Sequence, residues 1–284
     1  MTISLAEQRQ AFHAALCEEL LVIDNGVASN ADGSQTASVH IAHSIATELG
    51  AKEGVKLAGQ TAGLKFEQAV ERFLKATFGT GRSGLRPGSW SVDCIQSRVP
   101  LVIAQYEQYS HLAEIRKIAD DNPDLAAAIG LDYAVASDIV VARLPESDEA
   151  ILAAGINVDS SYADASPMRK VNNQKRMMHA SVSCKWTIRS DRAQNSRFEA
   201  LNLIRSRKGR VPHIVVVTGE PTPSRLSSLA LGTGDMDCIY HFALPELVRA
   251  VNELGQSEAI ALLNIMIEGK RLRDIADLPL DLSI

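Results

Sequence analysis

Long apolar segments are absent from this 284-residue chain, so no part of it is expected to cross a membrane. Its first residues lead directly into a polar helix, without the basic and apolar stretches of a secretory leader. The cysteines are few and far apart, which excludes the close spacings of zinc sites and redox pairs. They are Cys17, Cys94, Cys184 and Cys238. These absences predict a cytoplasmic protein with buried, reduced thiols.

An excess of positive charge is missing as well. The net charge is −5, from 29 basic and 34 acidic residues, and this value alone argues mildly against a nucleic-acid partner. The charge is unevenly distributed, however. Residues 169–210, the basic strip, contain twelve basic and two acidic residues (+10), which leaves 17 basic and 32 acidic residues (−15) elsewhere. The basic strip is either a solvated surface or a face that meets an acidic partner such as DNA.

Hydrophobic periodicity predicts one α/β domain over residues 1–284. Helical spacing favours helices over residues 4–25, 39–49, 66–74, 100–121, 190–205, 245–254 and 257–268. Apolar or alternating runs predict strands over residues 138–142, 181–188, 214–217 and 238–242. Turn-forming residues predict loops at 29–34, 59–63 and 232–234, and weak periodicity predicts a loop-rich segment over 144–175. Because strands interleave with helices and no linker divides the chain, a single domain is expected.

Lys185 stands in the middle of a predicted strand, with Ser183 and Thr187 on its own face. An edge strand whose polar face meets water would explain it. A second explanation involves Asp138, at the start of a neighbouring predicted strand. Together with the Ser183-Cys184-Lys185 triplet, it has the layout of the PD-(D/E)XK nuclease core. There the Asp holds a divalent cation, and the Lys orients or deprotonates the attacking water and stabilises the phosphorane.

The second carboxylate of that layout is missing, because Ser183 stands in its place. Metal-assisted phosphodiester hydrolysis needs more than one carboxylate, so another acid must come from elsewhere. Glu199, on the helix that follows the Lys185 strand, is one candidate, and Glu67, beside the apolar stripe of its own helix, is another. The competing explanation for Glu199 is a surface acid paired with Arg192 or Arg197.

Arg189, Asp191 and Arg192 lie at a predicted strand-to-helix junction, a few residues beyond Lys185. Arginine is the best bidentate reader of guanine in the major groove, and a carboxylate accepts a hydrogen bond from the cytosine amino group. Because phosphates repel a carboxylate, the aspartate favours base reading over phosphate contact. An ordinary helix start, capped by aspartate and flanked by surface arginines, is the alternative.

Three other functions compete with a nuclease. A Ser/Lys hydrolase would use Ser181 or Ser183 with Lys185, but no oxyanion loop is evident. A nucleotide-binding enzyme would use residues 231–235, which lack the full glycine fingerprint and the following lysine. A protein that binds GC-rich DNA without cutting it would not need Asp138, Lys185 and Glu199.

Segments spread over nearly the whole chain resemble the NgoMIV family of restriction endonucleases. The resemblance is carried by residues 179–195, and by 29–34, 59–61, 207–210, 212–217, 221–225, 240–244 and 277–282. It is weakest over residues 144–175.

The resemblance implies a type II endonuclease with a PD-(D/E)XK fold, in which helices flank a central mixed β-sheet. It implies cleavage of double-stranded GCCGGC after the first G, with Mg²⁺, leaving four-base 5′ ends. It also implies a homotetramer, a dimer of dimers, in a bacterial cytoplasm.

The resemblance also implies residue roles. Asp138, Ser183 and Lys185 would form the catalytic core, with Glu67 and Glu199 supplying the displaced acidic functions. The main-chain carbonyl of Cys184 would join Asp138 on the metal. The readers of the inner CCGG would be Arg189, Asp191 and Arg192. The residues addressing the outer G·C pair would be Asp32, Ser34, Gln60 and Arg225.

Overall fold

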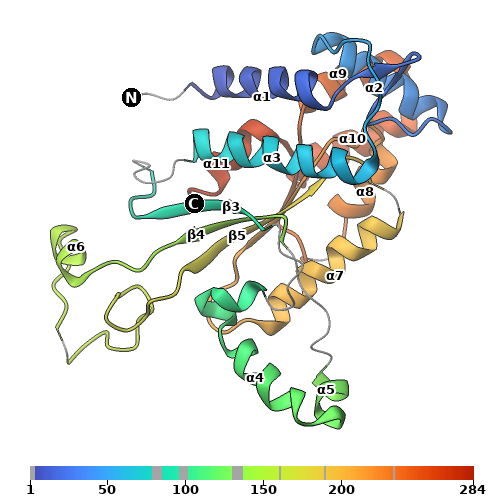
Figure 1. The fold of residues 1–284 in the computed structure, drawn as a ribbon. Coiled ribbons are helices and arrows are strands. Elements are labelled where there is room, and N and C mark those ends of the chain that lie inside the picture. Colours follow the sequence, from blue (N-terminus) through green and yellow to red (C-terminus); the bar gives the residue numbers. More distant parts are fainter. Residues whose placement is uncertain are drawn as a thin grey trace.

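A six-stranded mixed β-sheet lies at the centre of the described part of the molecule in the computed structural model (Figure 1). Its strands are β3 (Trp90–Cys94), β4 (Ile139–Arg143), β5 (Met177–Lys185), β6 (His213–Thr218), β7 (Cys238–His241) and β8 (Leu272–Asp274), adjacent in that order. Strands β3, β4 and β5 pair antiparallel, whereas β5 to β8 run parallel. The structure describes residues 4–78, 85–95, 102–129, 137–159, 161–188, 190–232 and 234–284, without the side chains of 190–193.

Helices cover both faces of the sheet (Figure 1). On one face, α1 (Leu5–Glu19) packs against α3 (Gly59–Thr77), which contacts β3 and β5. On the other face lies α7 (Ser190–Ser206), with α4 (His111–Asp120) and α5 (Pro123–Ile129) beyond it. A further group gathers near β7 and β8: α2 (Thr36–Glu48), α8 (Pro223–Ala230), α9 (Leu244–Leu254) and α10 (Ser257–Glu268). The predicted α/β fold, a mixed sheet flanked by helices, is confirmed.

Burial on both faces explains why the central strands read as continuous apolar runs. Ile139, Val140, Val141 and Ala142 of β4 are fully buried, and all of β6 beyond His213 is buried too. Strands enclosed between two helical layers have no solvent face that would favour polar residues.

The remaining elements are short. They are the hairpin β1 (Ile23–Asp24) and β2 (Val27–Ala28), the 3₁₀ turns η1 (Val102–Gln105), η2 (Glu107–Tyr109) and η3 (Ile275–Asp277), and the helices α6 (Asp148–Ala153) and α11 (Leu278–Asp281). No helix within the described ranges is long and apolar enough to cross a membrane. All four cysteines are free thiols, two of them buried and two half-buried.

Several predicted boundaries were wrong. The first helix ends at Glu19 rather than near residue 25, because Asn25 and Gly26 form the turn of the β1–β2 hairpin with positive φ angles of 51° and 79°. Residues 59–63 are the first turn of α3 and not a loop. The long helix predicted from Pro100 is replaced by two 3₁₀ turns and α4; Pro100 itself lies outside the described residues.

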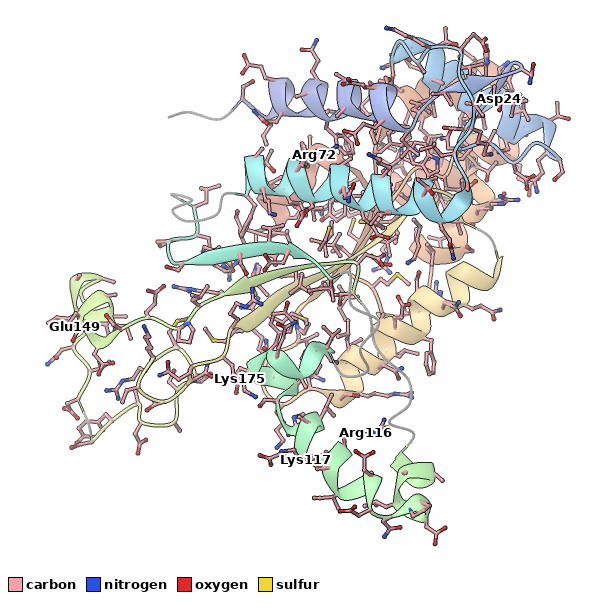
Figure 2. All side chains as sticks on the ribbon, in the orientation of Figure 1. Asp24, Arg72, Arg116, Lys117, Glu149 and Lys175 are labelled. Atoms are coloured by element: carbon pink, nitrogen blue, oxygen red, sulfur yellow. The ribbon has the colours of Figure 1, made fainter. Side chains whose placement is uncertain are left out.

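The segment 144–176 leaves the sheet as a projection between β4 and β5 (Figure 1). Figure 2 shows Glu149 on its helix α6 and Lys175 where the chain returns toward β5. The buried side chain of Arg169 organises it, because the guanidinium bonds both oxygens of Asp148 and the carbonyls of Asp159 and Tyr162. The prediction of a loop-rich segment is confirmed for its described residues, where α6 is the one helix and Arg169 joins the loops.

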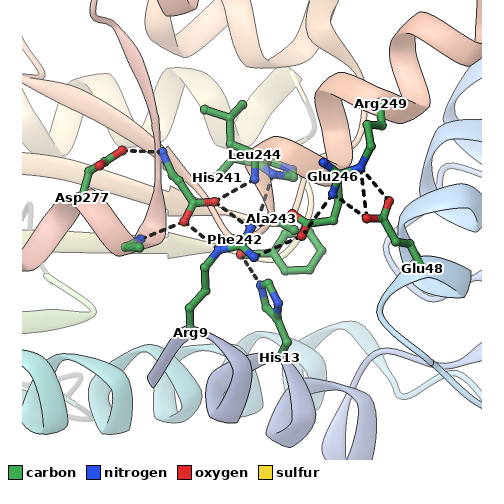
Figure 3. Close-up of polar contacts among 12 residues, drawn as sticks. Arg9, His13, Glu48, His241, Phe242, Ala243, Leu244, Glu246, Arg249 and Asp277 are labelled. Atoms are coloured by element: carbon green, nitrogen blue, oxygen red, sulfur yellow. Dashed lines mark hydrogen bonds and ion pairs between the residues drawn. The ribbon is translucent and has the colours of Figure 1, made fainter. Parts of the chain in front are cut away.

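Helix α1 is fastened to the far end of the chain by the side chain of Arg9 (Figure 3). Its guanidinium bonds both carboxylate oxygens of Glu246 on α9, at 2.6 and 3.0 Å. It also bonds both oxygens of Asp274 on β8, each at 2.9 Å. On the next turn of α1, His13 is 2.8 Å from the carbonyl of Phe242. Because α1 packs on α3, these contacts also hold α3 against the sheet.

We expect Arg9→Ala to lower the free energy of unfolding by about 2–4 kcal/mol, because two largely buried carboxylates would lose their cation. The matched control is Arg72→Ala, since Arg72 pairs with Glu19 but its side chain is 48% exposed; that pair is worth at most about 1 kcal/mol. Urea denaturation measures both. Equal losses in the two variants would contradict the role assigned to Arg9.

Candidate active site

The carboxylate of Asp138 is held by the end of the neighbouring strand. The antiparallel register pairs Ile139 with Val182, so Asp138, one residue before β4, lies opposite Ser183. Its Oδ2 accepts hydrogen bonds from the Ser183 hydroxyl at 3.3 Å, the Cys184 amide at 2.7 Å and the Lys185 ammonium at 3.1 Å. None of these three bonds uses Oδ1. The predicted core residues are thus brought together around one oxygen atom.

Lys185 is an ammonium group in this setting. Burial alone would lower the pKa of Lys185, but the carboxylates of Asp138 and Glu199 outweigh that effect, and the pKa is raised. The side chains of Lys185 and Asp138 are only 18% and 20% exposed, so water screens their attraction weakly. A lysine that keeps its proton orients water and stabilises developing negative charge rather than acting as a base.

The two predicted accessory acids reach the same centre from opposite layers of the fold. Glu67 lies on α3, and burial together with the charge of Asp138 raises the pKa of its carboxyl to about 7. Glu199 lies on α7; burial is again the main cause of its raised pKa, with Lys185 opposing and Asp138 adding to the shift. Of the two arginines in the competing explanation for Glu199, Arg197 instead bonds Asp235 at 2.9 Å, and the side chain of Arg192 is not among those described.

The donor set suits a hard divalent cation. Asp138, Glu67 and Glu199 bring three carboxyl groups close enough for their charges to interact, and carboxylate oxygens are the ligands such ions prefer. The Cys184 amide donates a hydrogen bond to Asp138, so the main chain of Cys184 lies beside that carboxylate. Burial raises the pKa of the Cys184 thiol well above its ordinary value, so its sulfur is no thiolate ligand. Among the described residues, no three acidic, histidine or cysteine side chains form a preassembled cage.

Three of the four residues predicted for the outer base pair form a cluster. Asp32 accepts hydrogen bonds from the amide and hydroxyl of Ser34, and its Oδ2 bonds Arg225. These bonds, Ser34 first, lower the pKa of Asp32 to about 2. Asp32 and Arg225 line a cavity of about 530 Å³ together with Gly59. Gln60 follows Gly59 in the first turn of α3 and is exposed.

The inner readers are placed less completely. Arg189 lies outside the described residues, and Asp191 and Arg192 lie in the first turn of α7 with side chains that the structure does not describe.

The basic strip is not one continuous face. Several of its cations are neutralised by acids of the same chain. They are Arg169, Arg176, Lys185 and Arg197, paired with Asp148, Asp93, Asp138 and Asp235 respectively. Only part of the charge that suggested a DNA face is therefore available to a partner.

Sequence reasoning missed Glu220. Its carboxylate is fully buried and accepts a hydrogen bond from the Ile188 amide, close to the predicted readers. The signal was present, since a charged residue two positions after a buried strand is unusual, but nothing in the sequence indicated its partners.

Comparison with known proteins decides the family. Residues 12–284 match the sequence model of the NgoMIV restriction enzyme family. The chain belongs to this family. The type II restriction enzyme NgoMIV of Neisseria gonorrhoeae is 49% identical over 281 residues, which is 98% of this chain and 98% of that protein. The predicted family membership is confirmed. The predicted activity, that of a type II restriction enzyme and thus a site-specific DNA endonuclease, is confirmed with it.

Solved structures also match the chain. A PspGI restriction endonuclease in complex with substrate DNA aligns over 99% of this chain and 92% of that chain, with 11% identity and a TM-score of 0.27. This slight likeness adds nothing to the family assignment.

The raised pKa of Glu67 predicts a pH-dependent stability in the presence of a chelator. Between its ordinary value of 4.5 and about 7, the native carboxyl binds more protons than the unfolded one, so its contribution to stability falls as pH rises. Glu67→Gln cannot ionise and should stabilise the protein by about 1–2 kcal/mol near pH 8, with little effect near pH 4.

Glu71→Gln, one turn further along α3, is the matched control. Burial raises the pKa of Glu71, but hydrogen bonds from the Cys94 amide and Lys75 outweigh it and leave the pKa lowered. This variant should therefore destabilise the protein near pH 8. Urea denaturation at the two pH values measures both variants, and a Glu67→Gln effect independent of pH would refute the shift.

Proposed function

We propose that the chain hydrolyses double-stranded DNA at GCCGGC, after the first G, with Mg²⁺ and with Asp138 and Lys185 at the centre of the active site. The observation that carries this proposal is the convergence of Ser183, Cys184 and Lys185 on one oxygen of Asp138. Near-full-length similarity to the restriction enzyme NgoMIV supports it.

Each side chain has a chemical task in this proposal. Asp138 and the Cys184 carbonyl would hold Mg²⁺, which when bound polarises the phosphate and acidifies water. The Lys185 ammonium donates a hydrogen bond to the scissile phosphate and stabilises the charge that grows there. Glu67, with a pKa of about 7, can take up or release a proton near neutral pH. Glu199 balances the charge of Lys185 from the α7 side.

Recognition is divided between two groups of residues. Arg189, Asp191 and Arg192 read the inner CCGG from the start of α7, and Asp32, Ser34, Gln60 and Arg225 address the outer G·C pair. Asp32 and Arg225 are bonded to each other, which holds both side chains in place for contact with a base pair.

A DNA-binding protein that does not cut is the second candidate. It would need the basic and base-reading residues but not an acid cluster around a buried lysine. The coupling of Glu67, Glu199 and Lys185 with Asp138 therefore favours the nuclease.

The proposal also covers the domain organisation, the oligomeric state and the cellular location of the protein. We propose a single domain over residues 1–284, supported by the contact of α1, at the N-terminal end, with β8 at the other. A homotetramer, a dimer of dimers, and a bacterial cytoplasmic location complete the proposal.

Digestion of plasmid DNA of known sequence tests the function. With Mg²⁺ we expect cuts only at GCCGGC, with four-base 5′ ends, and with a chelator we expect none. Cuts at other sequences, or no cuts with any divalent cation, would contradict the proposal.

Lys185→Ala is the internal control of the same digest. It should reduce cleavage by ~10²-fold or more, because the stabilising cation is lost, while binding to a GCCGGC duplex stays within a few-fold of wild type. Loss of cleavage and binding together would show that Lys185 is structural.

Sedimentation velocity tests the assembly. Four chains of 30.7 kDa give a particle of about 123 kDa, and we expect this species without DNA. A stable particle of about 61 kDa, a dimer, would contradict the tetramer.

A further inference from the structure

Glu220 follows β6 and is 0% exposed, the most complete burial among the acids near the active site. A buried carboxylate is costly unless hydrogen bonds and an opposite charge compensate it. The groups that bond Glu220 therefore indicate which segments its carboxylate holds in place.

The two oxygens of Glu220 bond two separate segments. Oε2 accepts a hydrogen bond from the Ile188 amide at 2.8 Å, two residues before the first residue of α7. Oε1 accepts from the Thr222 amide at 3.1 Å and from the Thr222 hydroxyl. The guanidinium of Arg225 is 3.8 Å from Oε2 and bonds Asp32 with its other nitrogen.

The backbone that leads into Glu220 is fixed to the catalytic strand. The Thr218 hydroxyl donates to the Lys185 carbonyl at 2.7 Å, and the Glu220 amide donates back to that hydroxyl at 3.1 Å. The Gly219 amide also donates to the Lys185 carbonyl, at 3.1 Å. A side chain at Gly219 would place its Cβ 2.6 Å from the ring of Trp186, so only glycine allows this approach.

The N-terminal loop joins the same network. Asn30 donates its side-chain amide to the Gly219 carbonyl at 2.7 Å, two residues before Asp32. The segment 218–220 thus touches the catalytic strand, the entry to α7 and the loop of Asp32, and Glu220 is its charged member.

We propose that Glu220 is a positioning residue for sequence recognition, because its carboxylate fixes the backbone entering α7 and the side chain of Arg225 at one constant separation. It touches no DNA in this role. It sets the distance between the first turn of α7, whose backbone carries Asp191 and Arg192, and the outer readers Asp32 and Arg225, so that both groups fit one six-base-pair site. The inference rests on the proposed recognition of GCCGGC.

Glu220→Gln is the direct test. The amide would present an NH₂ group to the Ile188 or Thr222 amide and would remove the negative charge beside Arg225. Equilibrium binding is measured in a chelator, so that no DNA is cut. The duplexes contain GCCGGC, one inner substitution, one outer substitution, or no related sequence. We expect affinity for GCCGGC to fall roughly tenfold or more, with unrelated DNA bound as by wild type.

Asp281→Asn is the matched control. Asp281 is also a carboxylate with an arginine partner, since it accepts hydrogen bonds from Arg273 and, at 2.6 Å, from the Tyr240 hydroxyl, but it lies on α11 beside β7 and β8, outside the segments that carry the predicted readers. This variant should lower stability and leave the discrimination between the duplexes unchanged. Discrimination lost equally in both variants would overturn the inference, because general destabilisation would then be the cause.

Thr222→Val provides a second measurement if Glu220→Gln does not fold. It removes one donor to Oε1 and keeps the carboxylate, so we expect a smaller loss of discrimination, roughly threefold. If Glu220→Gln folds and discriminates between the duplexes as wild type does, the inference is overturned and the proposed function is not. If Glu220→Gln does not fold, full discrimination by Thr222→Val has the same consequence. Failure of the wild type to prefer GCCGGC would instead overturn the proposed function.

Discussion

The bonds that hold Asp138 Oδ2 against the end of β5 are the constraint on which the site depends. They exist because the antiparallel register of β4 and β5 places Asp138 opposite Ser183, so that three successive residues of β5 can donate to one atom. A shift of that register by one residue would turn Lys185 to the opposite face of the sheet. The fully buried residues of β4 oppose such a shift, because it would move each packed side chain from one helical layer to the other and disrupt the packing on both faces. The same strand register is therefore required by the packing of the core and by the geometry of the candidate active site.

The site also depends on the helical layers. Glu67 and Glu199 come from α3 and α7, on opposite faces of the sheet, and each feels the charge of Asp138. The position of α3 depends in turn on α1, which Arg9 ties to Glu246 and Asp274. The ion pairs of Arg9 near the N-terminal end thus help to fix the position of Glu67 on α3 relative to Asp138. In the proposed site, Ser183 replaces the second strand carboxylate of the PD-(D/E)XK layout, and the acids that would compensate it come from the tertiary structure rather than from a neighbour in sequence.

Local patterns were enough to predict the strand of Lys185 and the acid of Asp138, since alternation and burial leave direct traces in sequence. Val182, Cys184, Trp186 and Ile188 are buried as their alternation indicated. The start of α3 was not predictable, because Gly59, Gln60 and Thr61 favour turns and only packing makes them helical. Strand β3 was missed because its pairing with β4 has no local signal. Glu220 escaped for the same reason, as its partner Ile188 is 32 residues away in the sequence.

The measurement that tests this account most directly is the single-turnover cleavage rate of Asp138→Asn on a GCCGGC duplex with Mg²⁺. Asparagine keeps the shape and an acceptor for the donors of β5 but carries no charge. The account predicts a rate at least about 10³-fold below wild type, with the affinity for the same duplex in a chelator within a few-fold of wild type. A rate within tenfold of wild type in a correctly folded variant would show that the Asp138 carboxylate is not the centre of the reaction.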